Sequence, residues 1–255
     1  MSTRKTAVIT GASRGIGRAI ALRFAQGGYE VWALARTLEA LQELEVEAFA
    51  TSGKIRPLRL DAARSEDVLA ASRIILDAGS PQVLVNNAGI ALASPLAKTE
   101  LADFERTMAI NLTAPFLLCR ELMPAMAKGS GGRVINIAST AAVKGFKYTA
   151  AYCASKHGLL GLTRALAQEF ASKGVTVNAL CPGWTDTEML ASSATKISEA
   201  TGRSVDEARE TLARMNPLGR LITPGEVAEL CWFLASPAAA AVTGAAYAID
   251  GGEAS

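Results

Sequence analysis

Seven short runs of apolar and β-branched residues recur along the chain, and most neighbouring runs are separated by a segment long enough for a helix. Strands that are almost continuously apolar and alternate with helices are typical of a parallel sheet with both faces covered. The pattern therefore predicts an α/β fold: a Rossmann-like, doubly wound, seven-stranded parallel sheet with helices on both faces. The predicted strands are residues 7–10, 31–34, 55–60, 83–85, 134–137, 175–180 and 247–249.

One segment, residues 188–216, interrupts the alternation, because it is polar and rich in serine and threonine. It follows Pro182-Gly183 at the carboxyl end of a predicted strand, which is where open α/β sheets bind their ligands. We therefore expect an insertion that covers the substrate. A chain of 255 residues suffices for one large core, so residues 1–255 are expected to form a single dinucleotide-binding catalytic domain. The clearest predicted helices are residues 16–26, 65–76, 101–128, 151–172 and 224–234.

Charge and cysteine content narrow the class of partner. The formal net charge is +2 and acids and bases are interspersed, so neither nucleic acid nor a membrane surface is an expected partner. The four cysteines form no CxxC pair, which is typical of reduced thiols in a cytoplasmic protein. No segment has the roughly 20 apolar residues that span a bilayer, and the apolar start is too short for a signal peptide. Small molecules and further copies of the chain remain as expected partners.

Three glycines follow the first predicted strand directly and open the first predicted helix. Glycine permits a tight turn and a close approach of the backbone to a pyrophosphate, whose charge then meets the amides of a helix N-terminus. The spacing is GxxxGxG rather than GxGxxG, and such glycines taken alone also fit an ordinary turn. Their place at the first strand-to-helix turn of an α/β chain favours a dinucleotide site. The expected cofactor-binding residues here are Gly11, Ser13, Arg14, Gly15, Ile16 and Gly17.

The end of the second predicted strand indicates which cofactor is preferred. Dinucleotide folds often carry an acidic residue there, which binds the ribose 2′-hydroxyl. Residues 33–37 contain no acid, and Arg36 could instead form charge-assisted bonds to a 2′-phosphate, with Arg14 as a second positive group. The alternative is that both arginines are solvated surface charges. The missing acid together with the two bases favours NADP(H) over NAD(H).

A tyrosine and a lysine four residues apart, Tyr152 and Lys156, share one face of a predicted helix. The ammonium, helped by a positively charged nicotinamide, is expected to lower the pKa of the phenol, so that Tyr152 is the acid in reduction and the base in oxidation. Ser139 follows a predicted strand, and its hydroxyl can hold the substrate oxygen. Singly these are common surface and turn residues, but together they indicate a catalytic set. His157, the only histidine, lies on another helical face and is expected to be structural or solvated.

With these residues in view, the chain resembles the short-chain dehydrogenase/reductase family over essentially its whole length. The resemblance rests on motifs that follow one another in the family's order. They are Thr10-Gly11 through Gly17, Asn86-Asn87-Ala88-Gly89, Asn111, Ser139, Tyr152 with Lys156, Pro182-Gly183 and Asp250-Gly251-Gly252. The family usually assembles through its two long central helices and its last strand, so a homotetramer or a homodimer is implied.

The resemblance also implies roles for individual residues. Asn111 would be the fourth catalytic residue and would hold a water that passes protons from Lys156 to solvent. Asp61 would contact the adenine, and Thr185 and Thr187 would fix the nicotinamide carboxamide. Trp184-Thr185 departs from the family's frequent aromatic-aliphatic pair, which implies a more polar floor near the nicotinamide. The other implied cofactor-binding residues are Ala62, Asn87, Ala88, Gly89, Tyr152, Lys156, Pro182 and Gly183. No metal site is expected.

These features together predict an NADP(H)-dependent oxidoreductase that reduces a ketone to a secondary alcohol. Residues 137–140 and 151–158 look most similar to 3-oxoacyl-thioester and polyketide ketoreductases, so the expected substrate is a small carbonyl compound, thioester-linked or related. Lys128 and Lys173 lie near where such reductases dock a carrier protein, although ordinary surface lysines are the simpler explanation. One alternative is an NAD(P)-dependent dehydrogenase of small or aryl secondary alcohols. Another is a non-catalytic cofactor-binding regulator, a class that typically lacks the tyrosine or the lysine.

Overall fold

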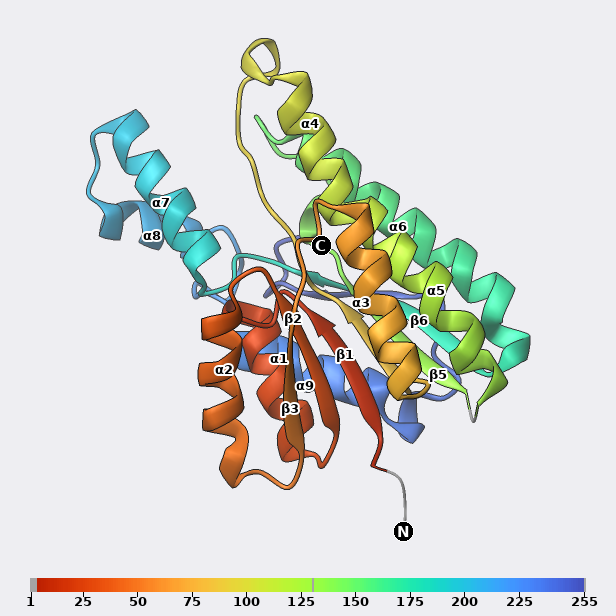
Figure 1. The fold of residues 1–255 in the computed structure, drawn as a ribbon. Helices are drawn as coiled ribbons and strands as arrows, with labels where there is room; N and C mark the ends of the chain where they lie inside the picture. Colours follow the sequence, from red (N-terminus) through yellow and green to blue (C-terminus); the bar gives the residue numbers. More distant parts are fainter. Residues whose placement is uncertain (1–3, 130, 255) are drawn as a thin grey trace.

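The computed structural model describes residues 4–129 and 131–254. Within that part of the chain, seven parallel strands form one sheet in the order β3-β2-β1-β4-β5-β6-β7, which confirms the predicted doubly wound fold (Figure 1). The chain winds outward from β1 to one edge and from β4 to the other, so the strand order reverses between β1 and β4. The strands are β1 (Thr6–Thr10), β2 (Glu30–Ala35), β3 (Lys54–Arg59), β4 (Val83–Asn86), β5 (Gly132–Ile137), β6 (Val175–Pro182) and β7 (Ala246–Ile249).

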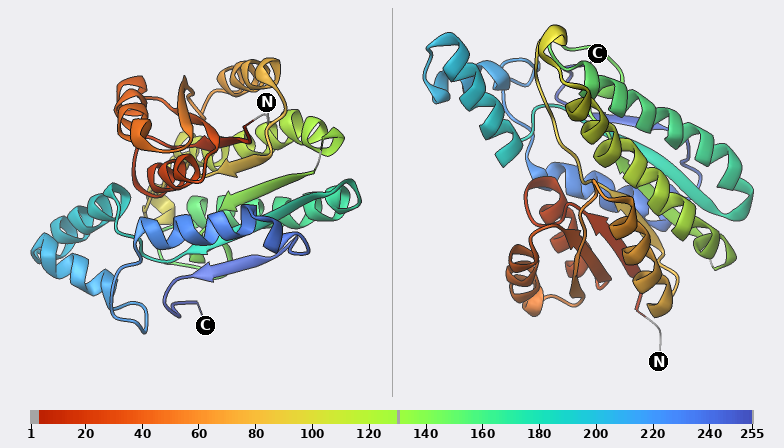
Figure 2. Two further views of the ribbon diagram at one scale, coloured as in Figure 1. Left: turned by 90° about the horizontal axis from the view of Figure 1, so that it is seen from below. Right: turned by 45° about the horizontal axis from the view of Figure 1, so that its top comes forward.

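Both faces of the sheet are apolar, because successive side chains of a strand point to opposite sides. In β1, Ala7 and Ile9 belong to one buried cluster and Val8 to the other. Helices α1, α2 and α9 cover the first face, and α3, α5 and α6 cover the second (Figure 2). Their bounds are α1 (Gly15–Gln26), α2 (Leu38–Glu47), α3 (Ser65–Ala78), α5 (Ala114–Lys128), α6 (Ala150–Phe170) and α9 (Pro224–Ala235). Short 3₁₀ turns lie at Ala48–Ala50, Leu96–Lys98, Thr140–Ala142, Ala171–Lys173 and Pro237–Ala239.

The predicted helical stretch over residues 101–128 is confirmed, but a π-helical turn that the sequence did not indicate divides it. The segment is α4 (Leu101–Met108), a π-helical turn η3 (Ala109–Thr113) and then α5. Pro115 explains part of the break, because it has no N–H to donate to the carbonyl of Asn111, four residues earlier. The side chain of Asn111 is also turned to the backbone of Ile90, which accepts and donates one hydrogen bond each. Such π turns within helices are frequent at functional sites.

The insertion at residues 188–216 contains two helices, α7 (Glu188–Thr201) and α8 (Val205–Ala213). They stand off from the sheet on the side of the carboxyl ends of the strands (Figure 1). A capping box between Ser204 and Glu207 begins α8. The two helices share a small apolar cluster of their own, made of Leu190, Ala194, Ala208 and Leu212.

No helix in the described residues has the length and apolarity needed to cross a membrane. The cysteines Cys119, Cys153, Cys181 and Cys231 are all unpaired. Burial raises the pKa of the Cys119 thiol to about 12, so this side chain is an inert part of the core.

A chain of buried hydrogen bonds joins the middle of the sheet to α6. Nδ2 of Asn86 on β4 donates to Oδ1 of Asn136 on β5 at 2.8 Å. Nδ2 of Asn136 donates to Oγ1 of Thr163 on α6 at 2.9 Å, and that hydroxyl donates to the carbonyl of Leu159 at 2.8 Å. Because buried polar groups are costly when unpaired, this series of hydrogen bonds fixes the position of α6 on the sheet.

We expect Asn136→Ala to lower the free energy of unfolding by about 2–3 kcal/mol, because it leaves the amide nitrogen of Asn86 with only the weak acceptor Sγ of Cys119, at 3.5 Å, and opens a void. Urea denaturation measures the change. Gln168→Ala, which removes an exposed amide from the same helix α6, is the matched control and should change the value by less than about 0.5 kcal/mol. Equal effects of the two substitutions would contradict a structural role for the network.

Candidate active site

The loop between β1 and α1 brings bare backbone to the carboxyl edge of the sheet. Gly11 has a φ of +65°, which favours glycine, and a Cβ atom at Gly17 would overlap the backbone oxygen of Gly11. Helix α1 begins at Gly15 after Arg14, with no acidic residue in its first turn. Its N-terminal amides can therefore meet an anion without a carboxylate from the same turn, although Oε2 of Glu188 on α7 would lie 3.6 Å from a Cβ atom at Gly15. Ser13 in this loop and Ile16 in the first turn of α1 are partly buried.

Asn87, which follows β4, holds this glycine loop in place. Its Nδ2 donates to the backbone oxygens of Thr10 and Gly11, at 2.9 and 3.2 Å. In return, Oγ1 of Thr10 accepts from the backbone N–H groups of Asn87 and Ala88, at 2.9 and 3.0 Å. Thr10 is thus a structural partner of Asn87, a role that its place at the start of the glycine motif did not reveal, and the side chain of Asn87 is engaged with the protein itself.

The ends of β1, β2 and β3 lie side by side and carry the residues expected to select the cofactor. Arg36 directly follows β2, and Arg14 lies in the loop after β1. Both side chains are exposed, and neither forms an ion pair with any residue that the structure describes. Asp61 and Ala62 follow β3, and Oδ1 of Asp61 accepts from the N–H of Ala63 at 3.0 Å. Two unpaired positive charges therefore lie on adjacent loops.

Lys156 projects from the second turn of α6 into the interior and is only 4% exposed. Its ammonium donates to the carbonyl of Ile137 at 2.8 Å, at the end of β5. A Cβ atom at Gly89 would lie 3.6 Å from Nζ of Lys156 and 3.4 Å from Oδ1 of Asn111, so these three residues are neighbours. Burial lowers the pKa of Lys156 to about 8, because the charged form is poorly solvated.

Tyr152 lies one turn before Lys156, with its ring centroid 5.7 Å from Nζ. Burial raises the pKa of Tyr152, and the hydrogen bond with the side chain of Ser139 opposes that rise. We expected the Lys156 ammonium to lower the pKa of Tyr152, but in the protein without cofactor this pKa is raised. Burial is the largest cause of the raised pKa, and the neighbouring ammonium donates its hydrogen bond to the Ile137 carbonyl rather than to the phenol.

Asn111 is fully buried in the π turn, and its side chain is occupied by protein partners. Oδ1 accepts from the N–H of Ile90 at 2.9 Å, and Nδ2 donates to the carbonyl of Ile90 at 2.9 Å and to Oγ of Ser155 at 3.0 Å. Oγ of Ser155 donates in turn to the carbonyl of Tyr152 at 2.7 Å. Ser155 is a linking residue that sequence analysis missed, and its only signal was its place between Tyr152 and Lys156.

The segment after β6 returns over the glycine loop. Oγ1 of Thr185 donates to the carbonyl of Gly183 at 3.0 Å, and Oγ1 of Thr187 donates to the carbonyl of Thr185 at 3.2 Å. Thr187 also caps α7, and a Cβ atom at Gly15 would lie 3.1 Å from its Cγ2. Residues from the ends of β1 and β6 therefore meet, as a dinucleotide site that spans the sheet requires.

Other residues considered from the sequence lie away from this edge. Lys128 ends α5, and Lys173 ends the 3₁₀ turn that follows α6, about 30 Å along the helix from Tyr152. His157 is exposed, and its Nδ1 contacts the carbonyl of Cys153 at 2.9 Å. The described residues contain no group of three side chains suited to bind a metal ion.

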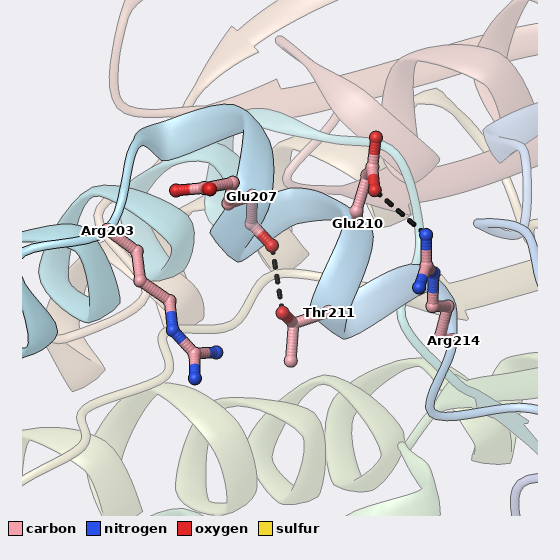
Figure 3. A pocket seen from close by; sticks show the side chains of 5 residues that line it. All are labelled: Arg203, Glu207, Glu210, Thr211 and Arg214. Carbon is pink, nitrogen blue, oxygen red and sulfur yellow. Dashed lines mark hydrogen bonds and ion pairs between the residues drawn. The ribbon is translucent and has the colours of Figure 1, made fainter.

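The α7–α8 pair carries a charged hollow, in which both carboxylates are bonded to residues of the same segment (Figure 3). Glu210 pairs with Arg214 at 3.0 Å, and the carboxylate of Glu207 accepts from the backbone of Ser204 at 2.8 Å. No residue predicted for the site lines this hollow. Its lining residues are Arg203, Glu207, Glu210, Thr211 and Arg214.

Known proteins resemble this chain over nearly its whole length. The family model described as "Enoyl-(Acyl carrier protein) reductase" matches residues 11–253. The D-threitol dehydrogenase of Mycolicibacterium smegmatis is 35% identical over 97% of this chain and 92% of that protein. A 3-oxoacyl-[acyl-carrier-protein] reductase of Synechocystis is 38% identical over 98% and 97% of the two chains. The crystal structure of a variant of the actinorhodin polyketide ketoreductase with NADPH superposes with a TM-score of 0.93, at 36% identity, over 100% of this chain and 99% of that one.

Lys156→Met tests the buried ammonium. The pKa of Lys156 in the folded chain, about 8, lies below its ordinary value of 10.5, so the unfolded chain binds more protons between these pH values. The cost of burying the charge is fully present below pH 8 and is relieved as the pH rises toward 10.5. Relative to Lys156→Met, the wild type should therefore gain about 3 kcal/mol in free energy of unfolding across this range. Urea denaturation at several pH values measures it, and a difference that does not change with pH would contradict the burial of the charge.

Proposed function

Since this chain belongs to the short-chain dehydrogenase/reductase family, we propose that it is an NADP(H)-dependent enzyme that reduces a ketone to a secondary alcohol. The observation that carries the proposal is the meeting of Ser139, Tyr152 and Lys156 beside the glycine loop at one edge of the sheet. The matches to an acyl-carrier-protein reductase and to an NADPH-bound ketoreductase over nearly the whole chain support the same reaction.

The chain offers a fitting site for NADP(H). The bare backbone at Gly11 and Gly17 and the open N-terminus of α1 suit a pyrophosphate, and a side chain at Gly17 would fill that space. When bound, the cofactor supplies or accepts the hydride. Residues proposed to hold it follow the edge of the sheet from β3 to β6. They are Gly11, Ser13, Arg14, Gly15, Ile16, Gly17, Arg36, Asp61, Ala62, Asn87, Ala88, Gly89, Tyr152, Lys156, Pro182, Gly183, Thr185 and Thr187.

The protein's own contribution to the reaction is proton transfer at the carbonyl oxygen. We assign Tyr152 as the acid in reduction, with Ser139 holding the substrate oxygen beside it. Lys156, with a pKa of about 8, is mostly protonated near neutral pH and can return a proton to the tyrosine. The side chain of Asn111 already bonds to Ile90 and Ser155. We therefore propose that the backbone carbonyl of Asn111 holds the expected water, because Pro115, four residues later, has no N–H to donate to that carbonyl.

Arg14 and Arg36 are the proposed selectors of NADP(H) over NAD(H). Both are exposed and free of ion pairs among the described residues, so neither has a carboxylate to compete with a 2′-phosphate. No acid stands at the end of β2 to bind a free 2′-hydroxyl.

The proposed substrate is a 3-oxoacyl thioester or a related small carbonyl compound, covered by residues 188–216. A dehydrogenase of small or aryl secondary alcohols is the second candidate, and the 35% identity to a D-threitol dehydrogenase favours it. The complete set of Ser139, Tyr152, Lys156 and Asn111 argues against a non-catalytic regulator.

We further propose that residues 1–255 act as one catalytic domain, in the cytoplasm, as a homotetramer or homodimer assembled through α5, α6 and β7.

Oxidation of NADPH and of NADH by the purified protein tests the function. The substrate panel should contain an acetoacetyl thioester, an aryl methyl ketone, a cyclic ketone and, for the reverse direction, a polyol. Fast turnover of the thioester with NADPH supports the first candidate. Turnover confined to free ketones or alcohols, or a preference for NADH, supports the second.

Tyr152→Phe should lower kcat by about 10²–10⁴-fold, because it removes the transferred proton and keeps the ring. NADPH affinity, measured by fluorescence titration of the purified protein, should stay within about twofold, since the hydroxyl serves the reaction more than cofactor binding. Turnover that survives the substitution would remove Tyr152 from the reaction.

Arg36→Asp should reduce the ratio of kcat/KM for NADPH to that for NADH by about 10–100-fold, because a charge-assisted bond to the 2′-phosphate becomes a repulsion. Arg73→Asp, at an exposed position on α3, has the same change of charge and is the matched control. An unchanged ratio in Arg36→Asp would mean that this arginine is a solvated surface charge.

A further inference from the structure

A carboxylate that the proposed mechanism does not use is buried beside the catalytic serine. The side chain of Glu253, which follows β7, is 1% exposed. Its Oε1 accepts from Oγ1 of Thr140 at 3.3 Å, and Thr140 is the residue directly after Ser139. Its Oε2 has no hydrogen-bond partner among the described residues. A charge so completely removed from water requires a compensating partner.

Lys144 is that partner, and it lies on the same loop as Ser139. Its ammonium is 3.5 Å from Oε1 of Glu253 and also donates to the backbone carbonyl of Glu253 at 2.5 Å. The backbone N–H of Lys144 donates to the carbonyl of Thr140 at 3.0 Å, which closes the turn that follows Ser139. Lys144 therefore closes the turn of residues 139–144, the Ser139 loop, through its backbone, and through its ammonium it anchors this loop to the segment after β7.

The same carboxylate also lies against the loop after β6. A Cβ atom at Gly183 would lie 2.7 Å from Oε2 of Glu253 and 2.9 Å from Cβ of Asp250. The carboxylate of Asp250 accepts from the N–H groups of Gly252 and Ala254, at 3.0 and 2.8 Å, which fixes the turn that carries Glu253. Loops after three neighbouring strands, β5, β6 and β7, thus meet at one buried charge.

We propose that Lys144 and Glu253 are positioning residues, which hold the Ser139 loop against the ends of β6 and β7 in the geometry that the reaction needs. Glu253 also lies against Gly183, an expected cofactor-binding residue. Lys144 bonds to Glu253 and, through its backbone N–H, to Thr140, so it acts on the reaction through the loop that carries Ser139. The inference rests on the proposed function, because Ser139 matters only if the site transfers a proton.

The expected consequence of breaking the pair is specific. Without Lys144 the buried carboxylate of Glu253 is uncompensated, and it gains solvent only if the turn at Thr140 moves. A displaced Ser139 no longer holds the substrate oxygen or the Tyr152 hydroxyl, whose pKa its hydrogen bond lowers. Catalysis should therefore suffer more than cofactor binding does.

Lys144→Met is the primary test. It should lower kcat by about tenfold or more while the KM for NADPH stays within about twofold. Hydrogen exchange of the backbone amides of residues 139–144 should become about tenfold faster, which is measured without substrate or cofactor. Lys144→Arg should recover most of kcat, because it restores the charge. Lys147→Met, which removes an exposed lysine from the same segment, is the matched control and should match the wild type in all three readouts.

The double variant Lys144→Met with Glu253→Gln separates the pair from a general loss of stability. It leaves no unpaired buried charge, so it should exchange more slowly at residues 139–144 than Lys144→Met does. If Lys144→Met does not fold, the double variant is compared with the wild type in its place.

Three results would overturn the proposal: a kcat of Lys144→Met within twofold of the wild type, an unchanged exchange rate at residues 139–144, or the same losses in Lys147→Met. Failure of the proposed function looks different, since the wild type itself would then reduce no ketone. In that case the exchange rates still decide whether Lys144 and Glu253 hold the loop.

Discussion

All strands of the described sheet run in the same direction, and this constraint places every part of the site. In a parallel sheet the carboxyl ends of the strands meet at one edge, and the chain returns to the other edge through a helix. Gly11, Ser139 and Gly183 follow three different strands and still arrive at the same edge. The reversal of strand order between β1 and β4 separates the first loops from one another and opens the place where a ligand binds.

Once the loops meet, buried hydrogen bonds decide how they are held. Asn87 ties the loop after β4 to the glycine loop, and Asn111 ties that same loop to α6 through Ser155. An unpaired polar group in a dry interior is costly, so networks in which every group has a partner favour one arrangement over the alternatives. These bonds hold the loops of the candidate site against one another and against α6.

Burial also sets the charge states of the site, and here reasoning from spacing was least reliable. The interval of four residues correctly indicated that Tyr152 and Lys156 lie together, because helix geometry requires it. It could not show that the ammonium is directed to Ile137, or that desolvation acts on both groups. The degree of burial depends on all the elements packed around a group, so a local pattern cannot supply it.

The sequence by itself determined the parallel sheet, the place of the glycine loop and the tyrosine–lysine pair, because each follows from the periodicity of a strand or helix and from the chain direction. It did not determine the π turn at Asn111, the two helices within residues 188–216 or the pairing of Lys144 with Glu253. The last two residues are 109 positions apart, and no local signal relates them. Only the tertiary structure decided these features, because contacts between distant segments depend on how every intervening element packs.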